Sequence, residues 1–130
     1  MSSPRSLRLL SVVAPVLNEG EVIEEFHRRL CAALDGIRFE LIVVDDGSTD
    51  ATPQILARLA DVDERVRVVE LSRNFGYQSA SSAGLDHAAG DVVVTIDAAL
   101  QDPPELIVEM LERWRGGSDV VYAVRRERQG

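Results

Sequence analysis

The segment from Asp97 to Glu105 carries the side chains of this chain that are best suited to hold a cation. It reads Asp97-Ala98-Ala99-Leu100-Gln101-Asp102-Pro103-Pro104-Glu105 and follows an apolar run, Val92 to Ile96. Carboxylate and amide oxygens are ligands that Mg²⁺ accepts, and Mg²⁺ is commonly bound by one or two carboxylates together with the phosphates of a substrate. The segment is therefore a candidate site for a cation and a phosphorylated ligand.

Two common phosphate-binding loops do not occur in the sequence. After the first apolar run, a dinucleotide-binding turn would need the pattern G-x-G-x-x-G, whereas Pro15 to Gly20 contains one glycine and a carboxylate. The G-K-[ST] sequence of a P-loop is also absent. A cation that bridges phosphates to acidic and amide side chains is the simplest remaining way to hold such a ligand.

Composition and charge favour one globular domain and argue against a nucleic-acid partner. The 130 residues are 45% hydrophobic and 28% charged, which is ordinary for a folded domain, and we expect a single domain over residues 1–130. The formal net charge is −8 and the sequence contains no lysine. Phosphate-backbone binding needs clustered Lys and Arg, so no nucleic-acid partner is expected.

Apolar runs alternate with segments of helical period along the chain. Strands are expected at 7–14, 39–44, 66–71, 92–96 and 120–124. Helices are expected between them, and the last has an apolar stripe at Leu106, Ile107, Met110, Leu111 and Trp114. Short strand–helix–strand units favour a parallel, doubly wound sheet with helices on both faces. The polar loops then meet at the carboxyl edge of the sheet, where such sheets bind ligands.

Local signals place the ends of several elements. Pro15 is expected to end the first strand, and Asn18 with Glu21 has capping-box spacing before a helix whose buried face includes Val22. Pro53 fits the first turn of the second helix. The acidic residues Asp45, Asp46 and Asp50 could be turn and cap residues, and Asp102 could cap the helix after the two prolines.

Four blocks in order resemble the family-two inverting glycosyltransferases, and among them the dolichyl- or polyprenyl-phosphate sugar transferases. The blocks are Val13-Ala14-Pro15-Val16-Leu17-Asn18-Glu19, Ile42-Val43-Val44-Asp45-Asp46-Gly47-Ser48-Thr49-Asp50, Asn74-Phe75-Gly76 with Ala83-Gly84-Leu85, and Asp97 through Glu105. The resemblance implies a GT-A type, Rossmann-like nucleotide-binding α/β sandwich. It also implies inverting transfer of a hexose from a nucleotide diphosphate sugar, of the GDP-mannose or UDP-glucose type, to a polyprenyl phosphate.

The same resemblance assigns roles to individual residues. Donor-binding positions would be Pro15, Leu17, Glu19, Val44, Asp46, Asp97, Ala98 and Arg125. Catalytic positions would be Asp97, Gln101 and Asp102, and Asp97 with Gln101 would hold Mg²⁺ or Mn²⁺. The family pattern D-A-D-L-Q-D-P-P-E has a metal-binding aspartate where this chain has Ala99, so weak or absent activity is expected.

Length adds a second departure from the family. The resemblance covers the donor-binding part, while the acceptor half and the C-terminal membrane helices of the family lie beyond it. Contact with a membrane is therefore expected only through such segments or through the lipid acceptor. No run approaches the ~20 apolar residues that cross a bilayer, and we expect a cytoplasmic chain working at the cytoplasmic face of a membrane. The alternative function is a non-catalytic nucleotide-sugar binding module; a receiver-like signalling domain is weaker, because it would need a lysine.

The remaining reactive side chains have simpler interpretations. Cys31 is the only cysteine, which excludes an internal disulfide, and we interpret it as a small core residue. His27 and His87 are interpreted as surface or packing residues without a histidine or cysteine partner at ligand spacing. Arg73, close to the expected ligand edge, is a weaker candidate for a phosphate contact.

Overall fold

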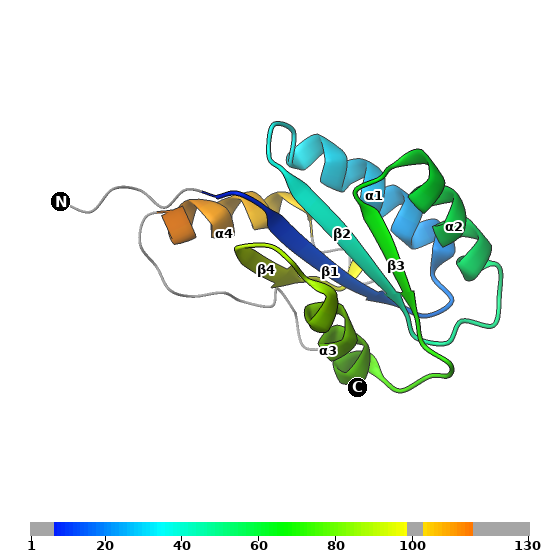
Figure 1. The fold of residues 1–130 in the computed structure, drawn as a ribbon. Helices are drawn as coiled ribbons and strands as arrows, with labels where there is room; N and C mark the ends of the chain where they lie inside the picture. Colours follow the sequence, from blue (N-terminus) through cyan, green and yellow to red (C-terminus); the bar gives the residue numbers. More distant parts are fainter. Residues whose placement is uncertain (1–6, 99–102, 116–130) are drawn as a thin grey trace.

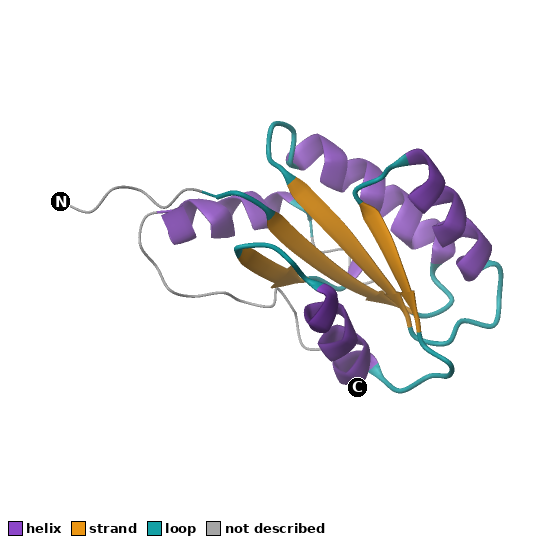
Figure 2. Ribbon diagram, in the orientation of Figure 1, coloured by secondary structure: helices purple, strands orange, loops and turns teal. Residues whose placement is uncertain are grey.

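A central sheet is covered by helices on both faces (Figures 1 and 2). The computed structural model describes residues 7–98 and 103–115. Strands and helices alternate along the chain throughout these residues. The elements are β1 (Leu10–Val16), α1 (Gly20–Ala33), β2 (Phe39–Asp45), α2 (Thr52–Val62), β3 (Val66–Glu70), α3 (Tyr77–His87), β4 (Val92–Thr95) and α4 (Glu105–Arg115).

The sheet has the strand order β3-β2-β1-β4, and all neighbouring strands are parallel. The chain moves outward from β1 to β2 and β3, then returns to place β4 on the other side of β1 (Figure 1). The expected parallel, doubly wound sheet is confirmed, and its winding reverses between β1 and β4. The predicted strand at 120–124 lies outside the described residues.

The two faces of the sheet bury different sets of side chains. One face of β1, including Val12 and Ala14, packs in a core with residues of α1, α2 and α4. The other face, including Val13, packs against Ala80 of α3. A Cβ atom at Gly84 would lie 2.3 Å from Cγ1 of Val13. The expected close packing of this small-residue helix on the sheet is therefore confirmed.

The predicted end of the first strand at Pro15 is wrong, because Pro15 lies inside β1 in register with Val44. Alternate residues of β1 bond to opposite neighbours, and on the β4 side Ile96 N donates to Val13 O at 2.9 Å. Pro15 faces the same side, where β4 has already ended at Thr95. A proline is tolerated there because no partner strand needs its N–H.

Two expectations about the first helix are also wrong. The residue at the N-cap position is Glu19, and no side chain caps the helix, so Asn18 and Glu21 do not form a capping box. Asn18 instead has a φ of 52°, a left-handed conformation that asparagine tolerates better than most residues. Val22 is 39% exposed rather than buried. The expected Pro53 in the first turn of α2 is confirmed.

The apolar stripe predicted for the last described helix, α4, faces the core, and its residues are buried to different extents. Ile107 and Leu111 are fully buried, whereas Met110 and Trp114 are partly buried and pack against the core from its edge. No helix among residues 7–98 and 103–115 combines the length and the apolar character that crossing a bilayer requires.

Candidate functional site

Loops at the carboxyl edge of the sheet line an open cavity of about 320 Å³. They follow β1, β2 and β3, which confirms that these loops converge at one edge. The cavity is lined by Pro15, Val16, Leu17, Glu19, Asp46, Asn74, Gly76 and Tyr77. Its size falls within the range of small-molecule sites, and its edge is the one where parallel α/β sheets bind ligands.

Asp46 connects the loops that form this cavity. Its carboxylate accepts hydrogen bonds from the backbone N–H of Phe75 at 2.8 Å and of Gly76 at 3.0 Å, and the residue is only 5% exposed. Its own N–H donates to Val16 O at 2.9 Å. At Gly47, which has a φ of 87°, a Cβ atom would lie 2.5 Å from the carbonyl carbon of Arg73. The loop after β2 therefore packs directly on the loop after β3.

Asn18 ties the loop after β1 to the loop after β2. Its Oδ1 accepts from Thr49 N at 2.8 Å and from Asp50 N at 3.3 Å, and its N–H donates to Ser48 Oγ at 2.8 Å. The amide thus satisfies loop backbone rather than the end of α1. Asp50 accepts from Thr52 N at 2.8 Å in the turn before α2, but the N-cap residue is Ala51 and no side chain caps the helix, so the expected cap at Asp50 is wrong.

The cavity is acidic, because Glu19 and Asp46 both line it. Glu19 Oε1 accepts from Leu17 N at 3.2 Å, which holds its side chain over the end of β1. A carboxylate has about four lone-pair sites, so both residues can accept further bonds. Hydroxyl and N–H groups of a ligand are the chemistry that such acceptors recognise. Arg73 lies 4.7 Å over the ring of Phe75 in the adjacent loop.

Asp97 lies just past β4, beside the edge that carries the cavity. Ile96 still donates to Val13, so the next residue, Asp97, is level with the end of β1. Asp97 is 2% exposed, and Ala98 is buried against the core. The structure therefore brings Asp97 and Pro15 to neighbouring strand ends at the point where the winding of the sheet reverses.

Not every predicted site residue lines the cavity or can be placed. Val44 is fully buried and packs with Val13 and Ala80 on the face of the sheet that α3 covers, so it lies beneath the cavity rather than in its lining. Ala99, Gln101, Asp102 and Arg125 lie outside the described residues.

Four lining residues have no ligand role in the sequence analysis: Val16, at the end of β1, and three residues that follow β3. Asn74 and Gly76 belong to a block that resembles the family, but no ligand role was given to them, and Tyr77 was not singled out. Their signal was their place directly after β3, because loops after parallel strands share one edge. Gly76 also has a φ of 99°, a conformation that favours glycine.

A parallel, doubly wound α/β sheet with an acidic cavity at its carboxyl edge places the chain among the α/β proteins that bind ligands at this edge, the nucleotide-binding proteins among them. Residues 11–130 match the model of the family described as Glycosyl transferase family 2, and the chain belongs to this family.

Relatives and a solved structure agree with this family. The chain is 50% identical over 122 residues to the uncharacterized glycosyltransferase YkcC of Bacillus subtilis, covering 92% of this chain and 38% of the relative. It is 44% identical over 121 residues to the bactoprenol glucosyl transferase of Shigella phage SfV, covering 92% and 39%. The chain thus spans about two fifths of the length of these relatives.

The fold resembles that of the mannosyltransferase PcManGT from Pyrobaculum calidifontis, solved in complex with GDP-Man and Mn²⁺. The TM-score is 0.63 at 34% identity, over 75% of this chain and 28% of that protein. The expected GT-A type sandwich is therefore confirmed.

Of the two predicted metal ligands, Asp97 lies within the described residues, so a divalent cation at this edge would be held largely by its phosphorylated ligand. Asp97 is 2% exposed, and the side chains of Ala98 and Ala99 contain no metal-binding atom. One or two carboxylates with substrate phosphates form a common Mg²⁺ site, so Asp97 with a pyrophosphate meets the lower limit of that arrangement.

Proposed function

We propose that this chain is the donor-binding part of an inverting glycosyltransferase that moves a hexose from a nucleotide diphosphate sugar to a polyprenyl phosphate. The observation that carries the proposal is the cavity of about 320 Å³ that Glu19 and Asp46 line at the carboxyl edge. The named activity of the bactoprenol glucosyl transferase and the GDP-Man bound by the mannosyltransferase support the acceptor and donor classes. The enzyme would work at the cytoplasmic face of a membrane.

In this proposal, side chains around the cavity bind the nucleoside. Pro15, Leu17 and Glu19 contact the base and ribose, with the Glu19 carboxylate accepting from ribose hydroxyls. Asp46 accepts from the base, and Val44 supports it from beneath. Arg125 matches the position of a donor-binding arginine and would contact the pyrophosphate. Ala98 has its side chain in the core, so it would meet the ligand only through its backbone next to Asp97.

Asp97 and Gln101 would hold the Mg²⁺ or Mn²⁺ ion, with Asp102 completing the catalytic segment. The ion, when bound, stabilises the negative charge that develops on the diphosphate leaving group. The acceptor phosphate is already anionic, so the attack on the anomeric carbon needs positioning rather than a strong base. Because Ala99 supplies no ligand, we propose that metal-dependent turnover of this chain is weak.

Calorimetric titration of UDP and GDP, with and without Mn²⁺, tests the proposal on the chain and on Ala99→Asp. We expect metal-dependent binding that becomes at least about tenfold tighter in Ala99→Asp, which is ~1.4 kcal/mol. Ala57→Asp, on the exposed side of α2, adds the same charge away from the cavity and should change nothing.

The possible results separate the two functions. Equal, metal-independent binding in the chain and in Ala99→Asp would support the non-catalytic binding module instead. Absence of nucleotide binding in both proteins would overturn the donor-binding role itself.

A further inference from the structure

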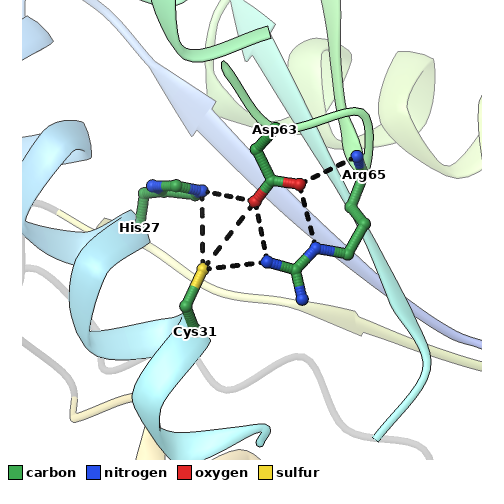
Figure 3. Close-up of polar contacts among 4 residues, drawn as sticks. All are labelled: His27, Cys31, Asp63 and Arg65. Carbon is green, nitrogen blue, oxygen red and sulfur yellow. Dashed lines mark hydrogen bonds and ion pairs between the residues drawn. The ribbon is translucent and has the colours of Figure 1, made fainter.

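His27, Cys31, Asp63 and Arg65 form a polar cluster at the amino edge of the sheet (Figure 3). His27 and Cys31 lie four residues apart on α1, so their side chains share one face of the helix. Asp63 follows α2, and Arg65 immediately precedes β3. Glu19 in the cavity lies two helical turns before His27, about 12 Å along the axis of α1. The cluster is therefore separate from the donor cavity.

The structure corrects the interpretation of His27 as a residue without a partner. Its Nε2 lies 3.5 Å from Cys31 Sγ and 2.8 Å from Asp63 Oδ2. The sequence signal was the i,i+4 spacing of His27 and Cys31, which places two ligand types side by side on a helix. Cys31, interpreted as a core residue, is only partly buried and belongs to this cluster.

The three ligand atoms are already arranged almost as a tetrahedral metal site requires. Bond lengths of about 2.0 to 2.3 Å to zinc place tetrahedral N, O and S ligands about 3.4 to 3.6 Å apart. The Nε2–Sγ separation is 3.5 Å and the Sγ–Oδ2 separation is 3.8 Å. Only the 2.8 Å between Nε2 and Oδ2 must open, by about 0.6 Å.

The ligand types select the metal. Imidazole nitrogen and thiolate sulfur suit Zn²⁺, whereas Mg²⁺ and Mn²⁺ prefer sites built from oxygen. The side chains of His27 and Asp63 are 15% and 11% exposed, so the site is sheltered but open to an ion from solvent. Among the described residues, this is the one group of three or more His, Cys, Asp and Glu with such convergent ligand atoms.

Arg65 occupies part of the cluster and can leave it without releasing Asp63. Its Nη2 lies 3.4 Å from Cys31 Sγ and 2.9 Å from Asp63 Oδ2. Its Nε and backbone N donate to the other carboxylate oxygen, Oδ1, at 2.9 and 3.0 Å. The side chain is 43% exposed, so the whole guanidinium can turn to solvent while the backbone N–H of Arg65 stays bound to Oδ1 and keeps the carboxylate oriented.

We propose that His27, Cys31 and Asp63 bind one Zn²⁺ ion, with water as the fourth ligand. The ion joins α1 to the turn between α2 and β3. Zinc binds the thiolate form of cysteine, so the proton of the Cys31 thiol passes to solvent when the Zn–S bond forms.

Zinc binding is measured on the reduced chain by competition with a chromogenic chelator, and Co²⁺ serves as the spectroscopic probe. We expect one Zn²⁺ per chain and a sulfur-to-cobalt charge-transfer band. His27→Gln, Cys31→Ser and Asp63→Asn should each weaken zinc binding at least about 100-fold. Loss of a residue that only hydrogen-bonds to a metal ligand costs up to about 100-fold, and loss of a ligand itself should cost no less. His87→Gln changes the other histidine, which is exposed on α3, and should leave zinc binding unchanged.

A second measurement needs no variant. Because Cys31 is the only cysteine, its alkylation by iodoacetamide reports on this site alone. Saturating Zn²⁺ should slow the alkylation strongly, and Mg²⁺ should not. The proposal is overturned if zinc leaves the alkylation rate unchanged, or if Cys31→Ser binds zinc as tightly as the unsubstituted chain. In those cases the cluster only links α1 to the start of β3 through hydrogen bonds.

Discussion

Asp46 shapes the candidate site with the same oxygens that face the cavity. Both oxygens accept backbone N–H groups of the loop after β3, which gives that loop its path beside the end of β1. A ligand that binds to Asp46 would therefore meet a carboxylate whose position is set by two neighbours. At the scale of the residue, one carboxylate thus both fixes the loop and would bind the ligand.

We expect Asp46→Asn to disturb both roles. Asparagine keeps one acceptor oxygen and replaces the other with an NH₂ group that faces a backbone N–H, so the loop loses a bond. The expected cost is ~1–3 kcal/mol of unfolding free energy and a weaker affinity for UDP or GDP. Guanidinium denaturation and calorimetry measure the two effects. Asp86→Asn, exposed on α3, is the control, and unchanged nucleotide binding in Asp46→Asn would contradict the assigned role.

Single residues differ in how far the sequence reveals their role. The role of Glu19 in the cavity lining follows from its place directly after an apolar strand. Asn18 was misread because its spacing to Glu21 fits a capping box, while its amide found competing N–H groups in a loop some thirty residues away. His27 and Cys31 acquire a third partner only when the chain brings Asp63 to them. Contacts over such sequence distances leave no local pattern.

At the scale of the elements, α3 depends on a residue without a side chain. A Cβ atom at Gly84 would lie 2.3 Å from Val13 Cγ1 and 3.1 Å from Val44 Cγ2. The helix is thus seated directly on the strands whose ends carry the cavity. Tyr77 and Gly76 at its start line that cavity, so the depth of the helix also positions them.

We expect Gly84→Ala to destabilise the protein by ~1–3 kcal/mol through overpacking, even though alanine favours helix by up to about 1 kcal/mol. The midpoint of urea unfolding measures this change. Ser82→Ala is the matched control, because it improves helix propensity at an exposed position of α3 and should leave stability equal or slightly higher. A more stable Gly84→Ala would show that the helix is not seated this closely.

The elements themselves were largely predictable, and their ends were not. Apolar runs of strand length predicted all four described strands. The central strands β1 and β2 are buried throughout, as expected of a parallel sheet covered on both faces, whereas the edge strand β3 is only partly buried. The end of β1 was misplaced because proline is compatible with a strand wherever its missing N–H has no partner. Whether the position of Pro15 has such a partner depends on where the neighbouring strand β4 ends, and the residues around Pro15 carry no information about that.

At the scale of the molecule, a buried carboxylate ties the amino-terminal parts of the strands together. Glu40 on β2 accepts from Ser11 Oγ on β1 at 2.6 Å, from Ala89 N at 2.8 Å, and from Arg67 on β3 at 3.2 Å. Ser11 Oγ in turn accepts from Gly90 N at 2.8 Å. The network joins three strands and the connection from α3 to β4 at the end of the sheet opposite the cavity.

The pKa of Glu40 is lower than usual, because bonds from Ser11, Ala89 and Arg67 outweigh the opposing effect of burial. A group with a lowered folded pKa contributes its stability above its unfolded pKa of about 4.3 and loses it as the pH falls through the folded value. Unfolding free energy should therefore fall between pH 5 and pH 3. Glu40→Gln should cost ~1–3 kcal/mol at pH 7, and the difference should narrow towards pH 3. Urea unfolding of both proteins at a series of pH values measures this difference in stability, and Glu24→Gln, at an exposed position of α1, is the control. If the stability difference between Glu40→Gln and the unsubstituted protein did not depend on pH, the charge of Glu40 would not be what holds the strands together.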